Sequence, residues 1–158
     1  MGIETERKFL VTGDFLSKFT TANRITQGYL CRDPARTVRI RVNDSLKTAY
    51  ITVKGLSSPD GMSRDEWEYE IPHVDGIAML KICGDEILSK VRYLVPTDGC
   101  YNYEVDVFLG MNQGLVVAEV EFVAGDLNVF VPDWVGEEVT GDNRYYNSQL
   151  IDNPYTKW

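Results

Sequence analysis

Charged and apolar side chains alternate at every second position along most of this chain. The alternation is strictest in residues 37–42, where Arg39 and Arg41 are interleaved with aliphatic residues. Successive side chains of a β-strand point to opposite faces, so each such stretch would form a strand with one charged and one apolar face. The chain is therefore predicted to be mainly β.

The same pattern, read along the chain, predicts eight strands, with few helices. We expect the strands at residues 3–11, 25–30, 37–42, 48–54, 64–71, 87–96, 101–108 and 115–123. The apolar spacing of residues 74–83 predicts a helix that ends before Gly84. Short helical pieces are expected at residues 15–19 and 143–150, and an irregular segment at residues 137–139.

The charged faces of these strands are segregated by sign. The acidic sets are Glu4 and Glu6, then Glu66, Glu68 and Glu70, then Glu104 and Asp106, and finally Glu119 and Glu121. The basic residues are Lys8, Arg39, Arg41, Lys54, Lys90 and Arg92. A surface that only keeps a protein soluble usually intersperses the two signs. An open sheet with its charged face in water nevertheless remains an alternative at this point.

If the sheet closes into a barrel, these charges converge on one lumen, and eight strands can enclose a small ligand. The apolar face would then point outward, covered by helices, loops and the tail. Like charges about 7 Å apart repel by about 2 kcal/mol at an effective dielectric constant near 20, so such clusters need compensation. Acid clusters select Mg²⁺ or Mn²⁺, and clustered Arg and Lys select phosphate. A metal-bound polyphosphate satisfies both.

Length and composition limit the other choices. The 158 residues are expected to form a single domain, residues 1–158. The net charge of −8 argues against nonspecific binding to nucleic acid or to a membrane surface. No apolar run could form a transmembrane helix or a signal peptide. The widely spaced Cys31, Cys83 and Cys100 are expected to be reduced thiols of a cytoplasmic protein.

An ordered set of motifs resembles the CYTH superfamily, the triphosphate tunnel metalloenzymes, in its short bacterial form. The first is Glu4-x-Glu6-x-Lys8, which is similar to the ExExK signature of that family. The others are residues 27–30, 37–41, 52–55, 66–70, 90–93, 104–106, 119–121 and 141–146. The resemblance spans nearly the whole chain and implies an eight-stranded antiparallel closed barrel that binds triphosphate with a divalent cation, Mg²⁺ or Mn²⁺.

The resemblance also implies a role for each charged residue. The phosphates would be held by Lys8, Arg39, Arg41, Lys54, Lys90 and Arg92. The metal would be held by Glu4, Glu6, Glu119 and Glu121, with Glu104 and Asp106 as further candidates. Glu66, Glu68 and Glu70 would either bind a second metal or form salt bridges with the arginines.

The expected reaction is the attack of water on a terminal phosphorus, with diphosphate leaving. Lys90 or Lys8 would orient or deprotonate that water if neighbouring cations lower its pKa. Tyr29 would either influence which end of the substrate is cut or be only a packed aromatic residue.

The first hypothesis is therefore an inorganic triphosphatase, with nucleoside triphosphates as further candidate substrates. A class IV-type adenylate cyclase and a thiamine triphosphatase of the same family are alternatives. Alternatives of other classes are a non-catalytic polyphosphate- or nucleotide-binding module and a purely structural sheet protein. The only expected partner is a triphosphate-containing small molecule, and the resemblance is compatible with a homodimer.

Overall fold

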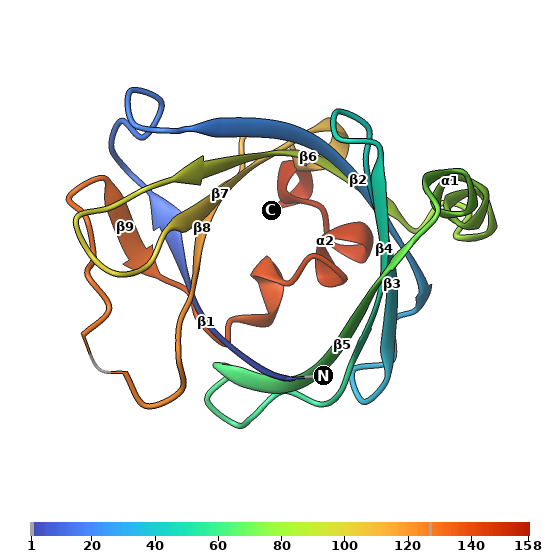
Figure 1. Ribbon diagram of the computed structural model, residues 1–158, viewed down its shortest axis with the longest axis horizontal. Coiled ribbons are helices and arrows are strands. Elements are labelled where there is room, and N and C mark those ends of the chain that lie inside the picture. Colours follow the sequence, from blue (N-terminus) through green and yellow to red (C-terminus); the bar gives the residue numbers. More distant parts are fainter. Residues whose placement is uncertain (1, 127) are drawn as a thin grey trace.

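A computed structural model describes residues 2–126 and 128–158 and shows a mainly β protein (Figure 1). The strands are β1 (Gly2–Val11), β2 (Thr21–Cys31), β3 (Thr37–Asn43), β4 (Thr48–Lys54), β5 (Ser63–Ile71), β6 (Ile87–Val95), β7 (Tyr103–Phe108), β8 (Val116–Glu121) and β9 (Val135–Glu138). The α-helices in this part of the chain are α1 (His73–Ile82) and α2 (Gln149–Asp152), and single 3-10 turns lie at Gly110–Asn112, Asn143–Tyr145 and Tyr155–Lys157.

The first eight strands of the described chain close into an antiparallel barrel, which confirms the predicted fold class. The sheet order is β5-β4-β3-β2-β6-β7-β8-β1-β9, and β5 also pairs with β1 to close the ring. The predicted helix at residues 74–83 is also confirmed as α1. Gly84 follows it at φ +61°, the left-handed conformation that commonly ends helices.

The ninth strand corrects the prediction of an irregular segment at residues 137–139. One edge of β1 pairs with β5 only over Gly2–Thr5, where Glu4 lies opposite Arg64. Beyond that point β5 has left the edge, and β9 takes its place at Phe9 and Val11. Since β9 is only Val135–Glu138, its sequence is too short to show an alternation; it is a strand because β1 offers unpaired backbone groups there.

Apolar side chains cover the outside of the barrel, as predicted. Helix α1 lies against β3 and β4 (Figure 1). Its Gly76 permits a close approach, since a Cβ there would lie 2.4 Å from the Cβ of Ala49. Elsewhere Phe9 and Tyr103 pack with Phe15 and Trp134 from the connections before β2 and β9. Residues 15–19 form a turn there rather than the expected helix.

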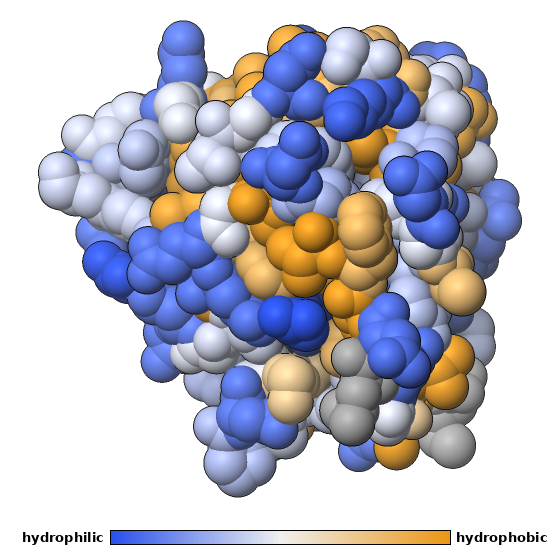
Figure 2. Space-filling model, turned by 90° about the vertical axis from the view of Figure 1, so that its left-hand side faces the viewer, coloured by the Kyte–Doolittle hydropathy of each residue, from blue (hydrophilic) through white to orange (hydrophobic). Residues whose placement is uncertain are grey.

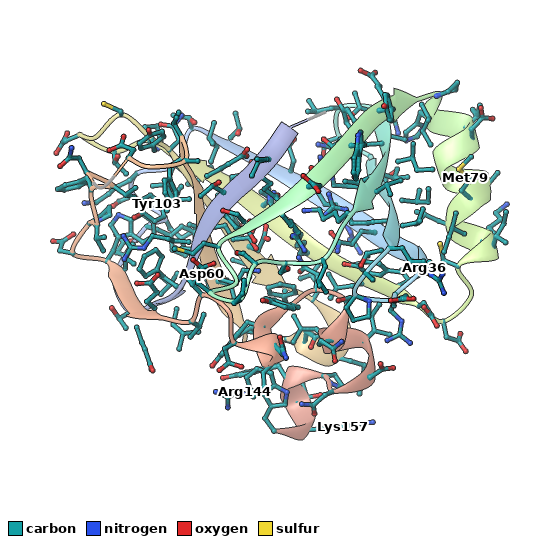
Figure 3. All side chains as sticks on the ribbon, turned by 90° about the horizontal axis from the view of Figure 1, so that it is seen from below. Arg36, Asp60, Met79, Tyr103, Arg144 and Lys157 are labelled. Atoms are coloured by element: carbon teal, nitrogen blue, oxygen red, sulfur yellow. The ribbon has the colours of Figure 1, made fainter. Side chains whose placement is uncertain are left out.

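The last part of the tail corrects another expectation, because it packs inside one end of the barrel. Leu88, Phe108 and Val117 lie on the same strand faces as Lys90, Asp106 and Glu119, and they contact apolar residues of the tail. The tail residues of this cluster are Val139, Tyr145 and Leu150. In Figure 1 the tail lies within the ring of strands. Figure 3 shows it at one end of the barrel, where its residues Arg144 and Lys157 are labelled. We call residues 139–158 the plug.

The plug is not the continuous helix expected at residues 143–150. A 3-10 turn at Asn143–Tyr145 is separated from α2 by extended backbone at Tyr146, with φ −71° and ψ 131°. The break lets Tyr145 and Leu150 both face the apolar end of the lumen, where they are buried.

The outer surface is otherwise mixed. Figure 2 shows the side that carries β9 and the segment leading to it, where hydrophobic residues lie between hydrophilic ones. Within the described residues, no helix combines the length and apolar character needed to cross a bilayer.

Candidate functional site: a charged cavity in the barrel

The barrel encloses a cavity of about 390 Å³ above the plug. Strands β1, β3, β4, β5, β6, β7 and β8 turn their charged faces toward it, and β2 contributes Tyr29. Its lining residues are Glu4, Glu6, Lys8, Tyr29, Thr37, Arg39, Arg41, Lys54, Arg64, Glu66, Glu68, Arg92, Leu94, Asn102, Glu104, Glu119, Glu121, Tyr146, Asn147 and Ser148. Cations and carboxylates are thus present in nearly equal numbers.

Most of the charged residues singled out from the sequence meet in this cavity, but three do not line it. Lys90 and Asp106 are 1% and 0% exposed and are absent from its lining. Glu70 lies near the end of β5, where its side chain is exposed. The alternation gives the face to which a side chain belongs; it does not give the depth at which the side chain lies.

Lys90, Arg92 and Asp106 form a buried ion cluster. Lys90 Nζ donates to Asp106 Oδ2, and Arg92 donates to both oxygens of Asp106, with Nε at 2.7 Å from Oδ1. Both oxygens of Asp106 are therefore already occupied in this arrangement. Burial and the neighbouring Arg92 lower the pKa of Lys90 to about 8, although Asp106 opposes the shift.

Two arginines of β3 face the cavity beside Glu68. Arg41 donates to both oxygens of Glu68 at 3.0 and 3.1 Å, and Arg39 donates more weakly at 3.4 Å. Thr52 also donates to Glu68, at 2.8 Å. The Nε of Arg39 is buried and has no hydrogen-bond partner among the described residues. Because buried donors are nearly always paired, this atom indicates an acceptor that belongs in the cavity.

Glu4 is held by cations of two other strands. Lys54 Nζ donates to its oxygens at 3.0 and 2.8 Å, and Arg64 Nε donates at 2.9 Å. Burial opposes ionisation, but Lys54 and Arg64 outweigh it and hold the pKa of Glu4 at about 2. Arg64 was not among the predicted site residues. It lies two positions before Glu66 on β5, so the alternation itself could have revealed it.

Lys8 lies between β8 and the plug. Its Nζ is 2.9 Å from Glu119 Oε1 and 5.7 Å from the ring centre of Tyr146. Burial alone would lower the pKa of Lys8, but Glu119 and Glu6 outweigh it and raise the pKa above its ordinary value. Lys8 thus stays charged as long as these carboxylates do, which suits it to hold an anion.

Glu6 and Glu121 stand out as carboxylates without a close cation. They are directly opposite each other on β1 and β8, a position in which like charges destabilise a sheet. The nearest cations to Glu6 are Arg64 and Lys8, at 3.9 and 4.0 Å, and Glu121 has no ion pair among the described residues. Burial, together with neighbouring carboxylates, raises the pKa of both groups.

This pair fits a divalent cation better than any other carboxylates in the cavity. In the described part of the chain, no three His, Cys, Asp or Glu side chains are grouped so as to hold a metal by themselves. Mg²⁺, however, is typically bound by one or two carboxylates together with substrate phosphates and water. Glu6 and Glu121 could supply those carboxylates. The other carboxylates of the lining are already paired with Lys or Arg at shorter distances: Glu4, Glu66, Glu68, Glu104 and Glu119.

Tyr29 reaches the cavity wall. Its hydroxyl accepts a hydrogen bond from Gln27 Nε2 at 3.1 Å, and both residues are buried. Burial raises the pKa of the Tyr29 phenol. The phenol therefore keeps its proton, which is free to be donated into the cavity.

The plug supplies a part of the wall that the sequence did not predict. Tyr146, Asn147 and Ser148 all line the cavity. They fall in an irregular segment with no alternation, so no periodic pattern marks them. The motif at residues 141–146 gave the only indication, and it did not show on which side of the barrel the tail lies.

Comparison with known proteins agrees with this geometry, although no family model matches the chain. An inorganic triphosphatase of Acetivibrio thermocellus is 45% identical over 157 residues, which are 98% of this chain and 97% of that protein. An inorganic triphosphatase of Nitrosomonas europaea is 34% identical over 149 residues, 93% of this chain and 95% of that protein. A crystal structure of an inorganic triphosphatase has a TM-score of 0.67 at 30% identity, covering 96% of this chain and 95% of that one. With full-length relatives at these identities and a barrel of the expected form, the chain belongs to the CYTH superfamily of triphosphate tunnel metalloenzymes.

Proposed function

We propose that the chain hydrolyses inorganic tripolyphosphate to diphosphate and phosphate, with Mg²⁺ or Mn²⁺ as the cation. One observation carries the proposal: a single cavity contains an unpartnered arginine donor, Arg39 Nε, and an opposed carboxylate pair without a close cation, Glu6 and Glu121. The arginine donor needs an anion, and the carboxylate pair needs a cation. Relatives that are named inorganic triphosphatases support the same substrate.

The phosphates are assigned to the cations that line the cavity. These are Lys8, Arg39, Arg41, Lys54 and Arg92, to which the structure adds Arg64. Each is now paired with a carboxylate, so binding a triphosphate exchanges some of these partners for phosphate oxygens. Arg–phosphate hydrogen bonds are short and charge-assisted, which favours that exchange.

The cation is assigned to Glu6 and Glu121, with Glu4 and Glu119 beside them. When bound, it neutralises charge that develops on the phosphate oxygens. In phosphoryl transfer the protein contributes little covalent chemistry of its own, so positioning of the substrate and charge neutralisation account for most of the catalysis.

The two lysines are assigned different roles. Lys8 lines the cavity with a raised pKa and binds phosphate. Lys90, whose pKa is lowered to about 8, is assigned the acid–base role, which requires it to part from Asp106 when substrate binds. A Lys90→Met variant that keeps the wild-type kcat would rule this role out. Tyr29 donates its phenol proton to a phosphate oxygen and so helps to fix which end of the substrate is cut.

The first test is product analysis on tripolyphosphate, ATP and thiamine triphosphate, each with Mg²⁺, Mn²⁺ or a chelator. We expect fast phosphate release from tripolyphosphate, slower release from the organic triphosphates, and none with the chelator. Cyclic AMP and diphosphate from ATP would instead identify a cyclase. Tight binding of tripolyphosphate without product under either metal would identify a binding module.

Loss of one arginine should weaken substrate binding. Replacing Arg39 or Arg41 by Ala is expected to raise KM for tripolyphosphate about 10- to 100-fold, the value of one charge-assisted hydrogen bond at roughly 1.5–3 kcal/mol. Steady-state kinetics at saturating metal measure this. Arg24→Ala is the matched control, because Arg24 is an exposed residue on the outward face of β2. Unchanged KM in both cavity variants would refute phosphate binding by β3.

A further inference from the structure

The plug places an amide group in the wall of the cavity. Asn147 lies between Tyr145 and Leu150, which are both buried in the apolar end of the lumen. The carbonyl oxygen of Leu150 also accepts a hydrogen bond from Asn112 Nδ2 at 3.2 Å. The segment that carries Asn147 is thus anchored on both sides, so its side chain has a defined place.

The amide oxygen of Asn147 is buried and has no hydrogen-bond partner among the described residues. An unpaired buried acceptor is rare in folded proteins and needs an explanation. A carbonyl-type oxygen only accepts, and phosphate oxygens and carboxylates are acceptors too. Its partner in a cavity that holds a triphosphate must therefore be an N–H or O–H donor or a metal cation. The Lys and Arg side chains that line the cavity are already paired with carboxylates, which leaves water as the donor that hydrolysis itself supplies.

Arg32 holds this segment from outside the cavity. Its Nε and Nη2 donate to the two oxygens of Glu86 at 2.7 and 3.1 Å, and its Nη1 donates to Asp152 and, at 3.3 Å, to the backbone oxygen of Ser148. Arg32 does not line the cavity. It joins the end of β2 and the turn before β6 to the residue that follows Asn147.

We propose that the side-chain oxygen of Asn147 orients the water that attacks the terminal phosphorus, and that Arg32 is the positioning residue that holds Asn147 in place. This inference rests on the proposed hydrolysis of tripolyphosphate. The water oxygen forms the new bond to phosphorus, the bridging P–O bond breaks, and its electron pair leaves with diphosphate. Asn147 accepts a hydrogen bond from the water without taking its proton, which goes to the general base.

The test compares variants of Asn147 in the full chain. Asn147→Leu keeps the approximate shape and loses the acceptor, and we expect kcat for tripolyphosphate to fall about 10- to 100-fold, since misplacement of a reacting group has an effect of this size. KM should change by less than about threefold, as is typical of an interaction made mainly in the transition state. Asn147→Asp retains an acceptor oxygen and should retain more of kcat. Asn143→Leu is the control, because Asn143 is exposed in the same segment and does not line the cavity.

A double-mutant cycle tests the role of Arg32. Arg32→Leu should lower kcat about as much as Asn147→Leu, and the double variant should be no slower than the slower single variant, because both changes remove one interaction. Additive losses would overturn the positioning role. Urea midpoints measured on the same proteins would reveal a merely structural effect, which would lower the midpoint of Asn147→Leu without lowering its kcat.

Other outcomes overturn the assignment to water. A defect in Asn147→Leu that higher Mg²⁺ restores would make the amide a cation ligand, and a rise in KM alone would make it a phosphate contact. A wild-type kcat in an otherwise active enzyme would remove Asn147 from the reaction. An inactive wild-type protein would overturn the proposed function itself and this role with it.

Discussion

Replacing Glu6 by Gln is expected to abolish metal-dependent turnover, with a loss of about 1,000-fold or more in kcat/KM. The reason is that Glu6 and Glu121 are the opposed carboxylates best suited to a divalent cation, and removing a direct ligand sacrifices about 4 kcal/mol of transition-state stabilisation. The metal-free protein should become slightly more stable at the same time, on the order of 1 kcal/mol, because the repulsion across the β1–β8 pair disappears. Activity with varied Mg²⁺ and urea unfolding with a chelator measure the two effects.

Opposite effects on activity and stability distinguish this prediction from general damage to the fold. Glu70→Gln is the matched control, since Glu70 belongs to the charged face of β5 and is exposed outside the cavity lining. It should leave both quantities unchanged. Full activity of Glu6→Gln at low metal concentration would remove Glu6 from the cation site.

The largest loss of stability is expected from Asp106→Ala. Asp106 accepts from Lys90 and Arg92 in a region with almost no exposure. Its removal leaves the buried Lys90 without its carboxylate, whereas Arg92 keeps Glu104 and Glu119. Breaking a buried ion pair in this way typically costs about 3–5 kcal/mol. Urea unfolding at neutral pH measures the change, and the slope with denaturant should stay the same, since the amount of buried surface does not change.

A second variant separates charge from shape at this position. Asp106→Asn keeps the size and hydrogen-bonding oxygen of the side chain, so it should lose less stability than Asp106→Ala. Arg36→Ala is the control, because Arg36 is largely exposed in its pair with Asp33 and such pairs contribute little. If the midpoints of both Asp106 variants equalled that of the wild type, the buried ion cluster would have no structural role.

Much of the barrel could be predicted from the sequence because its strands carry a period of two. Arg39 and Arg41 had to share a face, and so did Glu119 and Glu121, whatever the tertiary structure. Closure of the sheet was a further step, argued from the segregation of charge and from the family resemblance. The structure confirms the closed barrel.

What the pattern could not predict depends on position along a strand and on long-range pairing. Glu70 has the right face, yet it is exposed outside the cavity lining, while Lys90 and Asp106 have the right face and lie outside the lining in buried positions. Arg64 was missed although it fits the pattern. Strand β9 forms because β5 leaves the edge of β1, and the sequence of Val135–Glu138 contains no pattern that indicates this pairing.

The plug could not be predicted for a different reason. Its apolar residues, such as Tyr145 and Leu150, were visible in the sequence, but apolar residues cover the outside of the barrel as well as one end of its lumen. The hydrophobic effect is non-directional, so composition alone does not choose between the two faces. The choice depends on Leu88, Phe108 and Val117, which replace charged residues on the lumen face at that end.

The pairing of β1 with β8 and β9 also determines when the protein can fold. Arg7 of β1 bonds to Glu138 of β9, 131 residues later in the chain. At about 5–20 residues per second, the ribosome adds Glu138 roughly 7–26 s after Arg7. Until then β1 has an open edge, of the kind that can pair with other chains. The edge of β1 is thus covered only late in synthesis, and contacts between residues so distant in the chain make that step slow.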